Sequence, residues 1–448
     1  MKKIAFLSIC ILALILLGLS DMRLQKKRIT DISEDTRIVQ EDVKNISKDT
    51  KAVPEATETV PVSAGTAEEQ TIRVLLKNNN FESEYHNSLQ VTSNNGFTIS
   101  DGNNTWQIKS GETKEFDPQS NEFAESSVLF LQSSDGKIFL PELIRERSSK
   151  EYEGEIEIRK TQQGLLVINI LPLEKYLCGV VPSEMPSSYP QEALKAQAVC
   201  ARTYSLQQIQ EGRAAEFFAD VDDSVSYQVY NNQDRAESTD RAVKETAGCI
   251  LAGKDGLEEA LYYSTSCGLD TNMDLSGEAV FAAFISESNI RAYEAGEPWY
   301  RWETYLSLES WEDVGAIEVR DRLPNGRAEE ICVTDRTGNE ELIEGEYNIR
   351  RFLAGGMQTI VLQDEEEISD MNLLPSAFFM LEPLYEEGSL TGYKVRGGGY
   401  GHGKGMSQNG AKYMAGEGMD YVEILEEYYP EADVRDMADY LAKNVHAW

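Results

Sequence analysis

One carboxylic acid, Glu184, stands in an unusually apolar and conformationally restricted part of the chain, "LPLEKYLCGVVPSEMPSSYP" (171–190). It lies between Pro182 and Pro186, precedes Met185 and follows a pair of valines. We expect a rigid apolar turn here, in which a carboxylate loses hydration and its pKa rises. A glutamic acid whose pKa moves from about 4.3 to about 6 or 7 can donate a proton near neutral pH. The residues alone leave open the alternative that Glu184 caps a helix or forms an ion pair.

A long helix is predicted directly after this turn, in "PSSYPQEALKAQAVCARTYSLQQIQEG" (186–212). Ser188 and Gln191 have the spacing of a capping box, Pro190 falls in the tolerated first turn, and Gly212 follows the end. The helix is rich in alanine, so another element can pack closely against it.

Two cations on this helix, Lys195 and Arg202, are seven residues apart and therefore share a face. Either can form an ion pair with Glu184. Two cations on a helix also commonly form a solvated stripe, and the spacing does not choose between these interpretations.

A second segment with chemical interest is the glycine-rich "RGGGYGHGKGMSQNG" (396–410), which surrounds His402. Gly398, Gly403 and Lys404 have the spacing of a phosphate-binding loop, but Gly405 stands where Ser or Thr must hold magnesium. Few residues follow, so the βαβ unit that such a loop requires is missing and the nucleotide interpretation is disfavoured. Helices are expected from about Ser407 through "QNGAKYMAG" and again in "YVEILEEYY".

Composition excludes several classes of partner and site. The 448 residues carry 42 Lys and Arg against 77 Asp and Glu, a net charge of -35, which makes nucleic acid a poor partner. With three His, six Cys and no CxxC spacing, we expect neither a metal nor any other cofactor. Five cysteines lie outside the N-terminal apolar run, and this odd number predicts buried free thiols instead of a disulfide framework.

The N-terminus contains an uncharged apolar run from Ile4 to Ser20, just long enough to cross a bilayer. No small-x-small cleavage site follows it, so residues 1–28 are predicted to form an uncleaved anchor, with the rest of the chain on the outer side of the cell membrane. More basic residues follow the run than precede it, and the positive-inside rule would place that cluster in the cytoplasm.

The remaining sequence predicts a linker and one domain. Residues 29–70 are acidic and polar and lack aromatic side chains, as a linker does. From residue 71 to about 440, short apolar runs such as "TIRVLL", "VLFLQ", "EIEIRK" and "LLVINIL" alternate with turn residues, and "SYQVYNN" and "EEALYYSTSCG" are also strand-like. Strands with few helices predict a strand-rich α+β domain.

Taken in order, "LPLEKYLCGVVPSEMPSSYPQEALKAQAVCARTYSL", "YQVYNN", "NGR", "GYGHGKGMSQNGAKYMA" and "ILEEYYP" resemble the stage II sporulation protein D and amidase-enhancer family (SpoIID/LytB). The resemblance covers about four fifths of the chain. It implies a lytic transglycosylase that cuts peptidoglycan glycan strands during endospore formation, anchored in the membrane with its domain on the wall side. Glu184 matches the catalytic glutamate of that family.

The other roles implied by the resemblance are substrate contacts. Arg202 matches the family's helix arginine, with Lys195 as a weaker companion, and both remain equally interpretable as structural supports. His402, Ser407 and Gln408 belong to the family's glycine turn near the active cleft, where His402 either touches substrate or braces the loop.

The chain departs from the family pattern in "YSTSCGLDT" (263–271). Members that begin this motif with His and carry two Cys there have the residue types of a metal site, but this chain has Tyr263, so a bound zinc is not expected. With the register kept, Cys267 replaces a glycine and Asp270 replaces a threonine. A substrate contact made by the family's threonine would fall to Thr271 or be lost.

Three hypotheses of different classes remain. The first is the anchored glycan-cleaving enzyme, and Glu184 in an apolar setting favours it. The second is a non-catalytic wall-binding module that stimulates an N-acetylmuramoyl-L-alanine amidase. The third, a scaffold among sporulation membrane proteins, is compatible with either.

Overall fold

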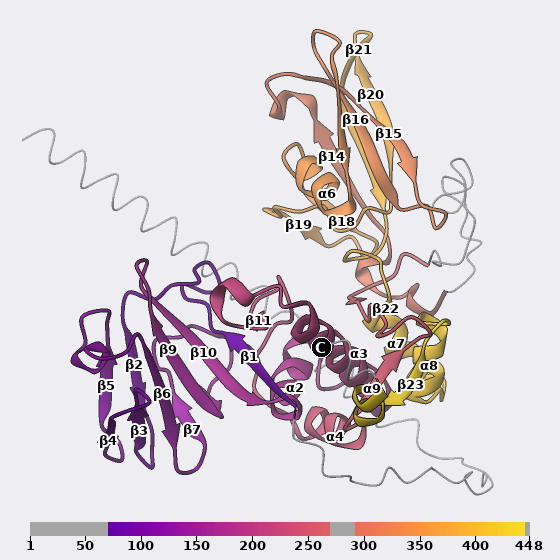
Figure 1. Ribbon diagram of the computed structural model, residues 1–448. Helices are drawn as coiled ribbons and strands as arrows, with labels where there is room; N and C mark the ends of the chain where they lie inside the picture. Colours follow the sequence, from indigo (N-terminus) through magenta and orange to yellow (C-terminus); the bar gives the residue numbers. More distant parts are fainter. Residues whose placement is uncertain (1–69, 269–291, 444–448) are drawn as a thin grey trace, which may run out of the picture. The chain divides into compact units, whose positions relative to one another are not determined.

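The computed structural model describes residues 70–268 and 292–443 of the chain (Figure 1). Strands predominate in these residues and are accompanied by seven α-helices, which confirms the α+β class. No helix in the two described ranges is long and apolar enough to cross a membrane. The predicted anchor (1–28), nearly all of the predicted linker (29–70) and Thr271 lie outside the described residues.

The first half of the described chain builds two antiparallel sheets. The larger has the order β11-β1-β10-β9-β6-β3-β4, in which only the β1–β11 pair is parallel, and the smaller has the order β5-β2-β7-β8. The strands are β1 (Thr71–Leu75), β2 (Leu89–Thr92), β3 (Phe97–Ser100), β4 (Thr105–Ile108), β5 (Thr113–Phe116), β6 (Val128–Ser133), β7 (Lys137–Phe139), β8 (Glu151–Glu153), β9 (Glu155–Lys160), β10 (Leu165–Pro172) and β11 (Val221–Asp222).

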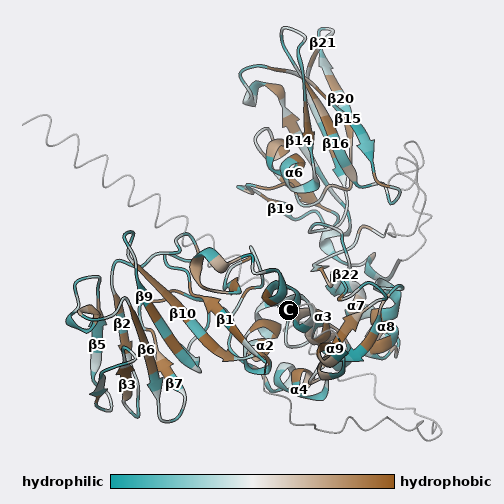
Figure 2. Ribbon diagram, viewed as in Figure 1, coloured by the Kyte–Doolittle hydropathy of each residue, from teal (hydrophilic) through white to brown (hydrophobic). Residues whose placement is uncertain are grey.

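Strand β10 shows why these apolar runs form strands. Leu165 and Val167 pack into one hydrophobic core, whereas Leu166 and Ile168 pack into another. Successive side chains of a strand point to opposite faces, so both faces of β10 are buried and its sequence is apolar almost throughout (Figure 2). The strand leads directly into the helix that carries Glu184.

Six of the described helices accompany the larger sheet, and the first two of them contact its strands. They are α2 (Leu173–Glu184), α3 (Gln191–Glu211), α4 (Glu237–Glu245), α7 (Gln408–Gly416), α8 (Tyr421–Tyr428) and α9 (Met437–Lys443). Helix α3 contacts α2, α4, α7 and α8. Its alanines at 193, 196, 198 and 201 are fully buried, which confirms that a slim helix surface admits close neighbours. The two predicted helices after Ser407 are α7 and α8. Gly212 follows the end of α3, as predicted, and has a φ of 60°.

Three local predictions were wrong. Glu184 ends a helix instead of lying in a turn, because Pro182 is accommodated inside the last turn of α2. The capping box is absent: Pro190 is the N-cap of α3 without a side-chain cap, and the Gln191 side chain bonds instead to Ser238 and Arg241. The segment "SYQVYNN" (226–232) is irregular and is not a strand.

Residues from Trp302 to Gly397 surround a core of their own that includes Trp302 and Phe379. A five-stranded sheet, β19-β18-β14-β21-β20, and a three-stranded sheet, β15-β16-β17, enclose it together with α6 (Glu346–Ala354). These strands are β14 (Trp302–Ser307), β15 (Val314–Arg322), β16 (Ala328–Asp335), β17 (Glu340–Glu344), β18 (Ile360–Leu362), β19 (Glu367–Ile368), β20 (Phe379–Glu386) and β21 (Ser389–Gly397).

Short elements connect the larger ones. Two small sheets pair β12 (Cys249–Ala252) with β23 (Asp433–Asp436), and β13 (Tyr262–Tyr263) with β22 (Met406–Ser407). The 3-10 turns are η2 (Asn121–Phe123), η3 (Ala215–Phe217), η4 (Ala292–Glu294), η5 (Pro298–Tyr300) and η6 (Leu308–Ser310). Because β13 and β22 are parallel, the residue after Ser407 begins α7 close to the segment 262–266.

Candidate active site

Glu184 is the last residue of α2, and its side chain is half-buried. The main-chain N–H of Val229 donates a hydrogen bond to its Oε1 atom at 2.5 Å. Burial raises the pKa of Glu184 to about 7, and the Val229 N–H opposes part of that rise because it favours the charged form. A carboxyl group in this state is half protonated near neutral pH, as a group that first donates and then accepts a proton must be.

Three phenols interact electrostatically with this carboxyl group. The charge of Glu184 acts on Tyr176 of α2, Tyr204 of α3 and Tyr262 of β13. Burial raises the pKa of Tyr204 to about 12, and it also raises the pKa values of Tyr176 and Tyr262 well above the ordinary value for a phenol. All three phenols therefore stay neutral, so Glu184 titrates in uncharged surroundings.

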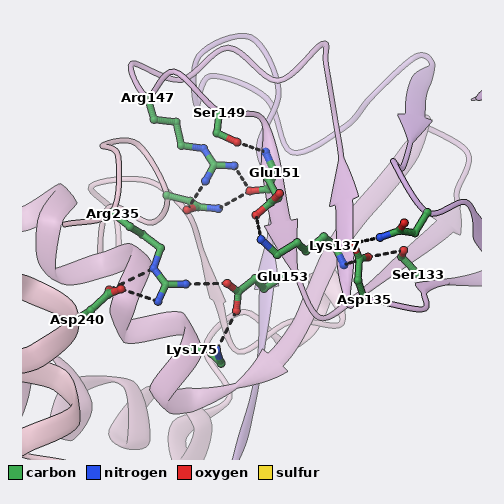
Figure 3. Close-up of polar contacts among 12 residues, drawn as sticks. Ser133, Asp135, Lys137, Arg147, Ser149, Glu151, Glu153, Lys175, Arg235 and Asp240 are labelled. Atoms are coloured by element: carbon green, nitrogen blue, oxygen red, sulfur yellow. Dashed lines mark hydrogen bonds and ion pairs between the residues drawn. The ribbon is translucent and has the colours of Figure 1, made fainter. Parts of the chain in front are cut away.

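A network of ion pairs holds the segment that carries Val229. Arg235, six residues later, pairs with Asp240 on α4 and with Glu153 on β8, and Glu153 also pairs with Lys175 on α2 (Figure 3). Nearer to Val229, the guanidinium of Arg147 donates to the Asn231 side chain at 2.5 Å. These contacts join the sheet, α2 and α4 around the segment, so its irregular backbone has a defined position opposite Glu184.

The structure does not bring Arg202 or Lys195 to Glu184. Arg202 is fully buried and makes a two-point ion pair with Glu174, at 2.7 and 2.8 Å, and its remaining N–H groups donate to main-chain oxygens. The ammonium group of Lys195 pairs with Glu192 and Glu245. Both cations bind protein partners, as the structural interpretation expects, and the ion pair with Glu184 is absent.

His402 lies in the glycine-rich loop with both ring nitrogens in use. Its Nδ1 accepts from the Lys404 N–H at 3.1 Å, so Nε2 carries the proton and donates to the main-chain oxygen of Tyr262 at 2.9 Å. Burial lowers the pKa of His402, which keeps the ring neutral. The ring also lies 5.6 Å from that of Tyr263, centre to centre. In this geometry His402 braces the loop against β13.

The glycines of this loop allow backbone to approach backbone. A Cβ atom on Gly405 would lie 2.0 Å from the Leu261 carbonyl oxygen, and one on Gly403 would lie 2.3 Å from the Phe378 ring. Both glycines have a φ of 69°, which disfavours other residues. The loop carbonyls are bound as well, since the Trp302 indole donates to Gly399 at 3.0 Å. The space next to these glycines is therefore occupied by other parts of the chain itself.

Among the predicted contact residues that the structure describes, Gln408 is the one that bonds directly to Glu184. Its amide donates to the main-chain oxygen of Glu184 at 3.0 Å and to the Gln197 side chain at 3.3 Å. Ser407, by contrast, is fully buried and is the N-cap of α7, where its hydroxyl accepts from Gly410. Gln408 thus links the first turn of α7 to the end of α2.

Another carboxyl group with a raised pKa, the buried Glu294, was not anticipated from the sequence. Its Oε2 accepts from the Ser266 N–H at 2.7 Å and from the Ser407 hydroxyl at 2.8 Å. Burial raises its pKa to about 8. No local pattern marks Glu294, because its partners come from segments 28 and 113 residues away. It supports the start of α7 and the "STS" segment, and with 4% of its surface exposed it is not open to a polymer.

Comparisons with known proteins indicate the family to which the chain is similar. The family model described as stage II sporulation protein matches residues 161–252, and a domain of unknown function (DUF8618) matches residues 253–405. An uncharacterized protein of Brachyspira hyodysenteriae is 31% identical over 288 residues, which cover 64% of this chain and 73% of that protein. Stage II sporulation protein D of Bacillus amyloliquefaciens is 29% identical over 289 residues, 61% of this chain and 77% of the relative.

A further relative is the amidase enhancer of Bacillus subtilis, 26% identical over 285 residues, which cover 57% of this chain and 39% of the relative. The stretch matched by the sporulation family model contains Glu184, the whole of α3 and Val229. The carboxyl group, the helix behind it and the N–H that bonds it therefore all fall within the matched residues, and the chain belongs to the SpoIID family.

Proposed function

We propose that the protein is a lytic transglycosylase that cleaves peptidoglycan glycan strands and leaves 1,6-anhydromuramic acid ends. The observation that supports this most is the half-buried Glu184, whose pKa lies near 7 and which faces neutral phenols. An ordinary glycosidase requires a second carboxyl group at the sugar. A lytic enzyme needs only one, because the substrate supplies its own nucleophile.

In the first half of the reaction, protonated Glu184 donates its proton to the glycosidic oxygen between muramic acid and the following glucosamine. The bond from C1 of the muramic acid to that oxygen breaks, and the glucosamine leaves with a hydroxyl group. The sugar left behind has oxocarbenium character, and Glu184 is now a carboxylate. The Val229 N–H stabilises that carboxylate through its hydrogen bond to Oε1.

In the second half, the C6 hydroxyl oxygen of the same muramic acid attacks its own C1. The hydroxyl proton passes to the Glu184 carboxylate, the new O6–C1 bond closes the anhydro ring, and the acid form of the enzyme returns. No water is consumed. A pKa near 7 serves both steps, because a stronger acid would be a poor base and a weaker acid a poor donor.

The proposed setting is a sporulating cell, with residues 4–20 anchoring the protein in the cell membrane and the domain on the wall side. The names of the SpoIID relatives support the link to sporulation. Protease added to intact protoplasts should digest the domain. Full protection under conditions that protect cytoplasmic proteins would contradict the topology.

The experiment that tests the enzyme proposal compares wild type with Glu184→Gln on purified, peptide-free glycan strands. Glutamine keeps the shape and can accept the Val229 hydrogen bond, but it cannot transfer the proton. Cleavage should fall by about 10³-fold or more, while the circular dichroism spectrum and gel-filtration volume stay unchanged. A folded glutamine variant that cleaves as fast as wild type would contradict the proposal.

A second candidate function is stimulation of a wall amidase without catalysis, which the relative named amidase enhancer favours. The same two proteins distinguish it. If an added N-acetylmuramoyl-L-alanine amidase is accelerated equally by wild type and Glu184→Gln, and neither cleaves strands, the enhancer function replaces the enzyme.

A further inference from the structure

Gln228 is buried directly beside the residue whose N–H contacts Glu184. It is 1% exposed and precedes Val229 in the irregular segment 226–232. Its side-chain oxygen accepts from the Tyr176 phenol at 3.4 Å and from the Ser205 hydroxyl at 2.9 Å, whose proton is shared with the main-chain oxygen of Ala201. Its amide nitrogen donates to the Tyr262 phenol at 3.1 Å and to the main-chain oxygen of Ala201 at 3.3 Å.

These four contacts use all the hydrogen-bonding capacity of one amide, two donors and two acceptor sites. They also reach three elements, α2, α3 and β13. Glutamate offers no donor to replace the two that bond the phenol and the carbonyl, and methionine offers neither donor nor carbonyl. The site therefore requires an amide of this length, and a buried amide with every group satisfied holds one orientation.

We propose that Gln228 is a positioning residue for Glu184: its amide fixes the backbone that carries Val229, so that the Val229 N–H stays directed at the carboxyl group. The phenol that accepts from Gln228 belongs to Tyr262, whose main-chain oxygen accepts from His402. The side chains of Tyr262 and Gln228 thus connect the glycine-rich loop to Val229, whose N–H bonds Glu184. As a role in catalysis, this inference rests on the proposed function.

The inference predicts that the pKa of Glu184 rises when Gln228 is replaced. A general loss of structure would not raise this pKa. The Val229 hydrogen bond lowers the pKa of Glu184 against the effect of burial. A loosened bond must therefore raise that pKa and keep the acid protonated to higher pH. Tyr176, Tyr204 and Tyr262 are the titratable groups that face the carboxyl, and burial keeps each pKa far above this range.

The test measures the pKa of Glu184 in the full-length chain by carbon NMR of labelled glutamate carboxyls. Comparison with Glu184→Gln assigns the resonance. Gln228→Met, and the smaller change Tyr262→Phe, should raise the pKa by about 0.5 to 1. Tyr230→Phe is the matched control, because that phenol lies in the same segment but donates to Asn169. It should leave the pKa unchanged.

On glycan strands, kcat/KM of the two test variants should fall about tenfold at the optimum, with KM unchanged, while the alkaline limb of the profile moves to higher pH. Folded variants with the wild-type pKa would overturn the inference. If Gln228→Met does not fold, Tyr262→Phe decides the question alone. If wild type cleaves nothing, the proposed function fails, yet the NMR measurement still decides whether Gln228 positions Glu184.

Discussion

Replacing Glu184 by glutamine should make the protein more stable, and the gain should depend on pH in a defined way. In the unfolded chain the carboxyl group has an ordinary pKa near 4.5, whereas in the fold burial raises it to about 7. Between these values the unfolded state ionises while the folded state stays neutral. The wild-type fold therefore loses stability as pH rises from 4.5 to 7, and glutamine, which does not ionise, loses none.

The size of the effect follows from the same two values. A difference of one in pKa corresponds to about 1.4 kcal/mol, so a rise from 4.5 to about 7 corresponds to about 3 kcal/mol. Because the side chain is half-buried and water reaches part of it, this value is an upper limit. The difference in unfolding free energy between Glu184→Gln and wild type should be smallest below pH 4.5, grow up to pH 7 and stay constant above it.

Urea unfolding of both proteins at several pH values between 4 and 8 measures this difference directly. Glu125→Gln is the control, since that side chain is exposed, and its difference from wild type should not vary with pH in this way. A Glu184→Gln difference that is flat with pH, or that falls as pH rises, would refute the inference that burial holds this carboxyl group in its acid form.

Three further predictions concern the supports of the site and its independence of metal. Arg202→Met should lower the free energy of unfolding by about 3 kcal/mol, because it leaves the carboxylate partner on α2 unpaired, and it should leave the pH dependence of cleavage unchanged. Gly403→Ala should lower the melting temperature much more than Gly388→Ala does. Both glycines have a positive φ, but only at Gly403 would a Cβ atom press against Phe378. Cleavage should survive chelators and need no added zinc, because the family resemblance puts Tyr263 where metal-binding members would have histidine. Stoichiometric metal whose release abolishes cleavage would contradict this.

The sequence was sufficient to predict what depends on local patterns. The strand around β10 follows from its apolar run, and α3 follows from an alanine-rich helical segment that ends at Gly212. The elevated pKa of Glu184 was also predictable, because apolar neighbours surround it in the chain itself.

What the sequence could not show depends on distant contacts. The turn expected around Glu184 is helical: α2 packs against α3 and α4 and extends to Glu184, although Pro182 costs it one hydrogen bond in its last turn. The segment with Val229 has alternating residues typical of a strand, but ion pairs with β8 and α4 hold it in an irregular path. Glu294 gains its environment from segments that only the fold brings together.

The central claim is that Glu184 donates one proton to the glycosidic oxygen and then accepts one from the C6 hydroxyl, while the muramic acid closes its anhydro ring. Cleavage of peptide-free glycan strands in water enriched in oxygen-18, followed by mass spectrometry of the new ends, tests it most directly. The account predicts ends one water lighter than hydrolysed ends, with no heavy oxygen incorporated, and it predicts that they are absent with Glu184→Gln. Ends that carry a heavy oxygen atom would show that water attacks C1, and would contradict the account.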